Sequence, residues 1–157
     1  MSFSVSVTSP DLDRQMAVLK YYPEIAAKHW YPAMQGAARD LKTIIEPTIP
    51  VLTGRARSMF KARATGKGTN IEGRVGWWGA GQPWYINVVE YGARPHVIRP
   101  KKEGGFLWFG GKYRFEAFHP GFAGRGFMAR GFEQGEARVV QRVATANERI
   151  VNELAVK

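Results

Sequence analysis

Glycine is concentrated in the middle of this chain and divides it into three parts. Residues 51–130 hold 15 of the 18 glycines and four of the five tryptophans. Glycine destabilises helix interiors and permits tight turns, so a segment this rich in glycine favours hairpins over helices. The length of 157 residues suits one domain. We therefore expect a single domain, 1–157, with a strand and helices in 1–50, a basic, tryptophan-rich sheet region in 51–126 and a C-terminal helix in 127–157.

Both flanks carry apolar residues at helical spacing. The pattern runs from about Pro23 to Ile45 and again over 127–154, with an apolar residue every three or four positions. Pro32 lies inside the first pattern, so we expect the helix to kink or split there. Pro47 ends it, because a proline disfavours helical backbone in the preceding residue.

The first residues predict two shorter elements. Phe3, Val5 and Val7 alternate with serine and threonine, which is typical of an edge strand. Ser9 and Pro10 then predict the start of a helix, with serine as N-cap and proline at the first helical position. The segment has neither a basic start nor an apolar signal core, so we expect it to belong to the mature fold.

The glycine-rich centre predicts antiparallel hairpins. One has a flexible basic tip at 65–70, and another turns at Gly110-Gly111. Residues 83–91 suit either a helical turn or a strand. The segments expected to be extended are 55–64, 71–78, 96–100, 106–109 and 113–118. The fold class is therefore α+β: an antiparallel sheet with hairpins, against which a long N-terminal helix and a C-terminal helix pack.

Positive charge follows the same division. The chain holds 23 Lys and Arg against 13 Asp and Glu, a net +10, and residues 51–130 hold 14 basic and 4 acidic residues. The whole excess lies in the centre, which favours an anionic partner such as nucleic acid or an acidic protein face. No stretch approaches the roughly 20 apolar residues of a membrane span, and we expect no membrane partner.

Basic side chains in the first hairpin are candidates for that contact. If the segment is a strand, Arg55, Arg57, Lys61 and Arg63 project to one face, because side chains alternate along a strand. Lys67 lies at the tip. Such a stripe can follow the phosphates of DNA without reading its sequence, or contact an acidic protein.

Four tryptophans in the centre have two interpretations. Trp77, Trp78, Trp84 and Trp108 could stack on bases, as in single-strand binders. They are also the residue type enriched in protein cores and subunit interfaces, which we favour. No recognised DNA- or RNA-reading motif accompanies them.

The chain offers little for catalysis. It has no cysteine, which excludes a thiol nucleophile and a cysteine-type zinc site, and it has no G-x-S-x-G elbow. His96, His119 and Glu90 have the types of a two-histidine, one-carboxylate metal site, but no short ligand spacing supports them. We expect no catalytic, cofactor-binding or metal-binding residues.

Four segments nevertheless occur in an order that resembles a bacteriophage family. They are Pro50-Val-Leu-Thr53-Gly54-Arg-Ala-Arg-Ser58; Tyr85-Ile-Asn-Val-Val-Glu90-Tyr91-Gly92; Pro95-His96-Val-Ile-Arg99-Pro100-Lys101 with Phe106-Leu-Trp-Phe109; and His119-Pro120-Gly121 before Gly126-Phe127-Met128. This order resembles the gene-product-ten-like minor tail components of lambdoid long-tailed phages, over residues 20–150. The departures are Ala56 for a leucine, Ser58 one position early and Gly126 for a proline.

The resemblance implies a structural virion protein made in the bacterial host cytoplasm. Its subunits would form a ring, sixfold in the simplest case, around the DNA channel between the head connector on the portal side and the tail tube. Tail terminator, completion factor and adaptor all fit this description, and the family suggests no catalytic residue. The motif residues are interpreted as turns that specify the fold: Pro50, Thr53, Gly54, Glu90, Gly92, His119, Pro120 and Gly121.

Two alternatives stay open from the residues alone. One is a basic protein that binds nucleic acid without sequence preference. The other is a metal-dependent enzyme that uses His96 and His119.

Overall fold

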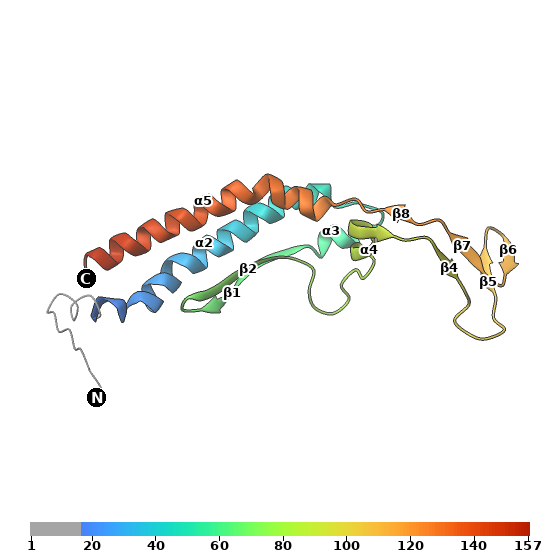
Figure 1. Cartoon of the computed structure of the whole chain (residues 1–157), viewed down its shortest axis with the longest axis horizontal. Coiled ribbons are helices and arrows are strands. Elements are labelled where there is room, and N and C mark those ends of the chain that lie inside the picture. The colour runs from blue at the N-terminus through green and yellow to red at the C-terminus, as the bar shows by residue number, and fades with distance from the viewer. Residues whose placement is uncertain (1–16) are drawn as a thin grey trace, which may run out of the picture.

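A computed structural model describes residues 17–157 of the chain. The edge strand expected at residues 3–7 and the helix start expected at Ser9 lie outside the described residues. The α+β class is confirmed: two long helices flank a series of antiparallel hairpins (Figure 1).

The two long helices lie side by side and run antiparallel (Figure 1). α2 spans Tyr22–Ile45 and continues into the 3₁₀ turn η1, Glu46–Thr48; α5 spans Phe127–Ala155. Both match the expected bounds closely. Of the kink or split expected at Pro32, the split is wrong, because α2 runs unbroken through it. Packing against α5 along its length stabilises α2 more than local propensity does.

Small residues let α2 and α5 approach closely. Gly131 and Gly135 of α5 are buried, and a Cβ on Gly131 would lie 2.4 Å from Cγ1 of Ile45. A Cβ on Gly135 would lie 2.5 Å from Cδ2 of Leu41. The glycines that weaken the first turns of α5 are therefore needed for packing, because a larger residue would push the helices apart.

We expect Gly131→Ala to destabilise the protein although alanine is the better helix former. The helix-propensity gain is at most about 1 kcal/mol. Overpacking against the buried Ile45 costs about 1–3 kcal/mol. Chemical denaturation measures the difference. Asn152→Ala, at an exposed position of the same helix, is the control, and an increase in stability for Gly131→Ala would contradict the close packing.

Ion pairs join the two helices. Arg142 on α5 donates from Nε to Oδ2 of Asp40 over 2.5 Å and from Nη2 to Oδ1 over 3.2 Å. Near the other end, Lys28 and His29 contact the carboxylate of Glu153 at 2.8 and 2.7 Å. The hydrogen bond from Arg142 holds the pKa of Asp40 below its usual value, and that from Lys28, followed by that from His29, does the same for Glu153.

These lowered pKa values predict acid sensitivity of the helix pair. A carboxyl group whose pKa is depressed on folding contributes stability that is fully present above its unfolded pKa and disappears as pH falls through the folded one. The ordinary values are 3.8 for Asp40 and 4.5 for Glu153, so the loss is expected below about pH 4. Melting temperatures of the natural chain and of Asp40→Asn should converge between pH 6 and pH 3. A gap that stays constant with pH would contradict this.

The first hairpin packs on α2. Strands β1 (Lys61–Lys67) and β2 (Asn70–Gly76) pair with Lys67 opposite Asn70, so Gly68-Thr69 forms a two-residue turn. Oε1 of Gln35 on α2 accepts a hydrogen bond from the Ala64 amide at 2.8 Å. The expected hairpin is confirmed, but it begins at Lys61, because residues Arg55–Ser58 form one helical turn, α3.

The remaining strands build an arm that leads away from the helices (Figure 1). After α4 (Ile86–Tyr91), the strands are β3 (Gly92–Ala93), β4 (His96–Ile98), β5 (Leu107–Phe109), β6 (Lys112–Arg114), β7 (Ala117–His119) and β8 (Phe122–Ala123). They pair as β3–β8, β4–β7 and β5–β6, with the expected turn at Gly110-Gly111. We call residues 92–125 the arm.

The described residues form two-stranded pairs and no continuous sheet, and the way the strands of the arm pair explains this. The three pairs of the arm are nested, so each one extends the ribbon lengthwise instead of adding a strand sideways. Residues 113–118, expected as one strand, divide between β6 and β7. Residues 51–130 therefore contain four two-stranded pairs, and the outer edge of each strand has no further strand paired to it.

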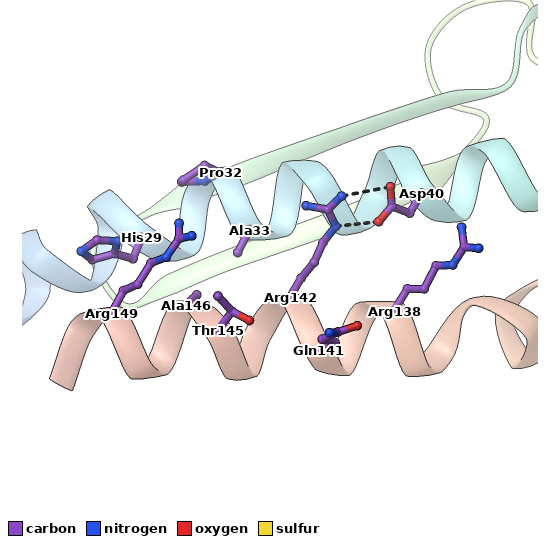
Figure 2. Close-up of a pocket in the computed structure, with 10 residues that line it drawn as sticks. All are labelled: His29, Pro32, Ala33, Asp40, Arg138, Gln141, Arg142, Thr145, Ala146 and Arg149. Carbon is purple, nitrogen blue, oxygen red and sulfur yellow. Dashed lines mark hydrogen bonds and ion pairs between the residues drawn. The ribbon is translucent and has the colours of Figure 1, made fainter. Parts of the chain in front are cut away.

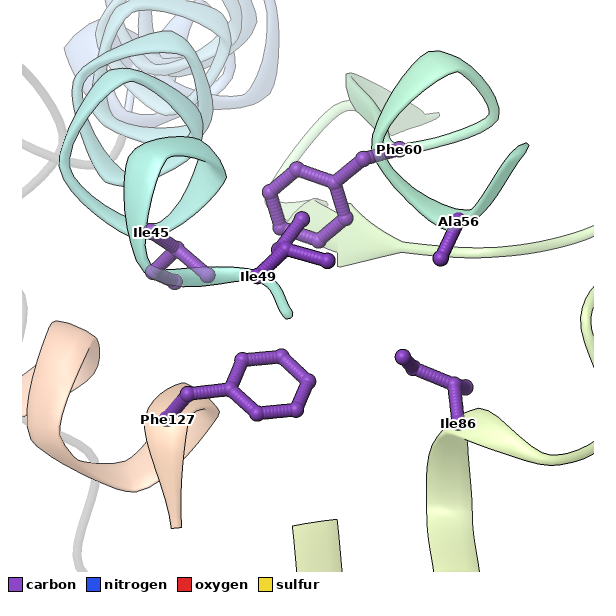
Figure 3. Close-up of a cluster of buried hydrophobic side chains, with 6 residues drawn as sticks. All are labelled: Ile45, Ile49, Ala56, Phe60, Ile86 and Phe127. Carbon is purple, nitrogen blue, oxygen red and sulfur yellow. The ribbon is translucent and has the colours of Figure 1, made fainter. Parts of the chain in front are cut away.

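The main core lies where the helices meet the base of the arm. Its side chains come from the end of α2, the residue after η1, α3, the residue before β1, α4 and the first residue of α5 (Figure 3). They are Ile45, Ile49, Ala56, Phe60, Ile86 and Phe127. A smaller cluster of Ile25, Ala26 and Ile150 closes the opposite end of the helix pair.

Candidate functional site

Three of the four family-like segments, the first, second and fourth, meet at one joint between α4 and α5, whereas the third lies on strands β4 and β5 of the arm. The Glu90 carboxylate, 9% exposed, accepts hydrogen bonds from the backbone amides of Met128 at 3.1 Å and Ala129 at 3.3 Å. The Glu90 carbonyl also accepts a bond from the Gly126 amide at 3.1 Å. The amides at the N-terminus of a helix lack partners within the helix and favour negative charge. Glu90 therefore caps α5 from a position 38 residues away.

Glycines allow the chain segments at this joint to touch. A Cβ on Gly92, which has φ +83°, would lie 2.4 Å from the Phe122 carbonyl oxygen. A Cβ on Gly124 would lie 2.2 Å from the Glu90 carbonyl oxygen, and one on Gly121 would lie 2.5 Å from that of Ala93. Gly92 and Gly121, expected as turn residues, both have a positive φ, but they lie along the arm: Gly92 opens β3, and Gly121 lies between β7 and β8.

The first motif also forms a turn. Gly54 has φ +77° and precedes α3, and its carbonyl accepts a hydrogen bond from the Ser58 amide at 3.0 Å. Thr53 Oγ1 accepts from the Arg55 amide at 3.4 Å. Pro50 lies on the wall of a groove described below.

The expected basic stripe is wrong in its first half. Arg55 and Arg57 lie on α3, and their guanidinium groups are bound to backbone carbonyls. Arg57 donates to Pro47 O at 3.0 Å and to Ile49 O at 3.2 Å, while Arg55 donates to Gly81 O at 3.0 Å. A helical turn forms here because Gly54 starts it and the Ser58 hydroxyl bonds the Arg55 carbonyl at 3.0 Å.

The second half of the stripe remains on β1. Lys61, Arg63 and Lys67 occupy alternate positions of the strand and share a face. The Arg63 guanidinium lies 4.9 Å from the centre of the Trp78 ring, a cation–π contact. Lys61 Nζ donates to the Trp78 carbonyl at 3.4 Å. This face therefore presents three exposed basic residues, two of which already contact Trp78.

The four tryptophans separate into three kinds, and Trp78 is the intermediate one: it is half-buried, with the Arg63 guanidinium over its ring. Trp77 donates from Nε1 to Ala56 O at 2.6 Å and packs against Phe60 and Phe127, so it belongs to the core rather than to a subunit surface. Trp84 is 79% exposed and Trp108, on the arm, is 65% exposed. These two fit the interface expectation best.

The histidines of the metal hypothesis meet, but their carboxylate does not join them. His96 and His119 face each other across β4–β7, with ring centres 5.0 Å apart. Nδ1 of His119 accepts from the Gly121 amide at 3.0 Å, and Nδ1 of His96 donates to the Arg94 carbonyl at 2.8 Å. Glu90 is bound to α5 amides instead. Within residues 17–157, no three His, Asp or Glu side chains gather where they could hold a metal ion.

An apolar groove of about 720 Å³ opens at the base of the arm. Leu52 stands beside it and is 97% exposed. The other walls come from the first and second family-like segments and from β8. The lining residues are Pro50, Val51, Leu52, Thr53, Gly54, Arg55, Ala56, Tyr85, Ile86, Val89, Phe122 and Arg125.

A second hollow, of about 510 Å³, lies between the long helices (Figure 2). Arg138 and Arg149 extend from α5 toward α2, on either side of the Arg142–Asp40 pair (Figure 2). This site was not predicted from the sequence, because the acidic and basic residues of the C-terminal segment nearly cancel when its net charge is summed. The spacing of Arg138, Arg142 and Arg149, four and seven residues apart, is the sequence signal for one basic helix face.

Comparison of the chain with protein-family models, curated proteins and solved structures gives no match. None of the helices in residues 17–157 combines the length and the apolar character needed to cross a bilayer.

Proposed function

We propose that this chain is a structural virion protein of the head–tail joint of a long-tailed bacteriophage. Its subunits assemble into a ring, sixfold in the simplest case, that joins the tail tube to the head connector around the DNA channel. It acts by docking and not by catalysis. The protein is made in the host cytoplasm and ends in the neck of the particle, as terminator, completion factor or adaptor.

The convergence of the family-like segments carries this proposal. Segments that end at Ser58, Gly92 and Met128 are far apart in sequence, yet they line one joint with Glu90 at its centre. Residues that specify one joint are expected to occur together in an ordered signature, as they do here. The convergence of these three segments supports the interpretation of the weak motifs as one resemblance to the minor tail components, and the third motif lies on the arm that leaves this joint.

The surfaces suit a docking role. Two sets of ion pairs and closely packed small residues join the long helices into one unit. The arm carries exposed aromatic residues, the type enriched at interfaces. Lys61, Arg63 and Lys67 give a basic face that can meet packaged DNA or an acidic neighbour.

Particles of the phage that encodes the chain test the proposal. We expect the chain in purified virions, and gold-labelled antibody at the junction of head and tail. Absence from washed particles, or label spread along the tail, would reject it.

A second candidate is non-specific binding of nucleic acid, which the exposed basic face of Lys61, Arg63 and Lys67 on β1 favours. Retention on duplex DNA should then fall steeply with salt. Charge reversal of Lys61, Arg63 and Lys67 should lower the logarithmic salt slope by about 3, at roughly 0.9 per phosphate contact. The control is reversal of Arg138 and Arg149, which lie on α5. An unchanged slope for the β1 variant would exclude this face.

A further inference from the structure

The arm exposes aromatic side chains on both of its faces. Six phenylalanine, tyrosine and tryptophan rings beyond the base of the arm are between 57% and 74% exposed: Phe106, Trp108, Phe109, Tyr113, Phe115 and Phe118. Trp108 and Phe109 are neighbours on β5, so they point to opposite faces of the ribbon. A flat partner would cover only one of these faces, whereas a groove that receives the tip covers both.

The exposed area is large enough for a specific interface. An aromatic side chain contributes roughly 150–250 Å² when it is fully buried, so these six, each more than half exposed, present roughly 800 Å² in total. The largest apolar patch on an ordinary monomer is about 300–600 Å². A stable interface buries about 800 Å² on each partner. The exposed aromatic area of the arm therefore matches what one partner buries in a stable interface.

The same chain carries an apolar groove with the opposite shape. The groove at the base of the arm holds about 720 Å³, and Leu52 and Val51 on its wall are more than half exposed. The β5–β6 tip and this groove lie at opposite ends of the extended arm (Figure 1). One copy cannot fill its own groove with its own tip in this conformation, but a neighbouring copy can.

Charge disfavours the symmetrical alternative, in which two arms pair with each other. The arm holds seven basic and two acidic residues, a net +5 from 7 − 2. Two arms side by side would bring those charges together. The groove presents only Arg55 and Arg125, and Arg55 is bound to the Gly81 carbonyl.

We propose that the β5–β6 tip of one copy occupies the Leu52 groove of the next copy. The contact joins two different surfaces, so it repeats head to tail and closes into a ring when its rotation allows. This deepens the ring of the proposed function, on which it rests, but it is tested without any other phage component.

Cysteine pairs test the contact directly, because the natural chain has no cysteine. Leu52→Cys and Phe109→Cys are made in separate chains, mixed and mildly oxidised. We expect the mixture to form disulfide-linked dimers at least 10-fold faster than either variant alone. Equal or faster linking within one variant would show a symmetrical contact and overturn the proposal. So would a chain that sediments as a monomer at about 100 μM.

Charged substitutions on the β5–β6 tip supply a second, independent test of the contact. Trp108→Glu with Phe109→Glu should weaken self-association at least 10-fold while helical circular dichroism stays unchanged, since both side chains are exposed. Val140→Glu, at a 61% exposed position on α5, is the matched control. Self-association that survives the double variant would overturn the proposal. So would a monomer whose binding to DNA or lipid vesicles depends on these two residues.

Failure of the arm–groove contact can be distinguished from failure of the proposed role at the head–tail joint. A protein that sits in virion necks but does not self-associate through Leu52 and Phe109 contradicts the arm contact alone. A protein that links through them but is absent from virions contradicts the neck role alone.

Discussion

Glu90→Gln is expected to destabilise the protein by about 2–3 kcal/mol. The glutamine has nearly the same shape, but its amide group turns a donor toward the α5 amides that the carboxylate now satisfies. Buried donors left without an acceptor cost about 1–3 kcal/mol each, and charge-assisted bonds are the stronger kind. For a chain of this length, the loss lowers the melting temperature by roughly 5–10 °C, which calorimetry measures.

Glu116→Gln is the control for that experiment. Glu116 is exposed on the arm, and its contact with Arg99 is long, at 3.4 Å. Exposed pairs of this kind contribute about 0–1 kcal/mol. Equal effects of the two substitutions would show that Glu90 is not a cap.

Gly124→Ala is expected to have a larger effect, of at least about 3 kcal/mol, or to prevent folding of the joint. The added Cβ would lie 2.2 Å from the Glu90 carbonyl oxygen and 2.5 Å from the carbonyl carbon of Tyr91. No rotamer change relieves a clash between backbone segments, so α4 and β8 must separate. Amide hydrogen exchange should show faster exchange at Arg125 and Gly126, whose amides bond to α4 carbonyls.

Two further glycine substitutions separate crowding from backbone strain. Gly104 has φ +70°, and a Cβ added there would meet nothing within 4 Å, so Gly104→Ala bears only the left-handed penalty of about 1–2 kcal/mol. Gly92→Ala has both the left-handed backbone penalty and a steric clash, because Gly92 has φ +83° and a carbonyl oxygen would lie 2.4 Å from the added Cβ. We expect the order Gly104, then Gly124, then Gly92 in increasing cost. A Gly104 variant as destabilised as the other two would contradict the close approach at the joint.

The long helices and the hairpin turns can be predicted from sequence because their signals are local. The helical spacing predicts the end of α5 within a residue, and Gly110-Gly111 predicts the β5–β6 turn. Pro32 shows the limit of the same reasoning. A local rule expects a kink or a split there, whereas α2 continues through the proline without a break and packs against α5.

The joint and the arm cannot be derived in this way because they depend on long-range contacts. Nothing near Glu90 in sequence shows that its carboxylate caps a helix 38 residues later. Strand alternation places Arg57 in a basic stripe, yet Gly54 starts a helical turn that points its guanidinium at the carbonyls of residues 47 and 49. Trp77 and Trp108 have similar aromatic neighbours in sequence, and only the packing separates core from surface.

Disruption of the gene in its phage tests the central proposal most directly. We expect lysates of the disrupted phage to contain DNA-filled heads and separate tails, with few joined particles in electron micrographs. Purified natural protein added to such a lysate should restore joined, infectious particles, whereas the Trp108→Glu, Phe109→Glu double variant should not. Normal numbers of joined, infectious particles from the disrupted phage would contradict a role at the head–tail joint.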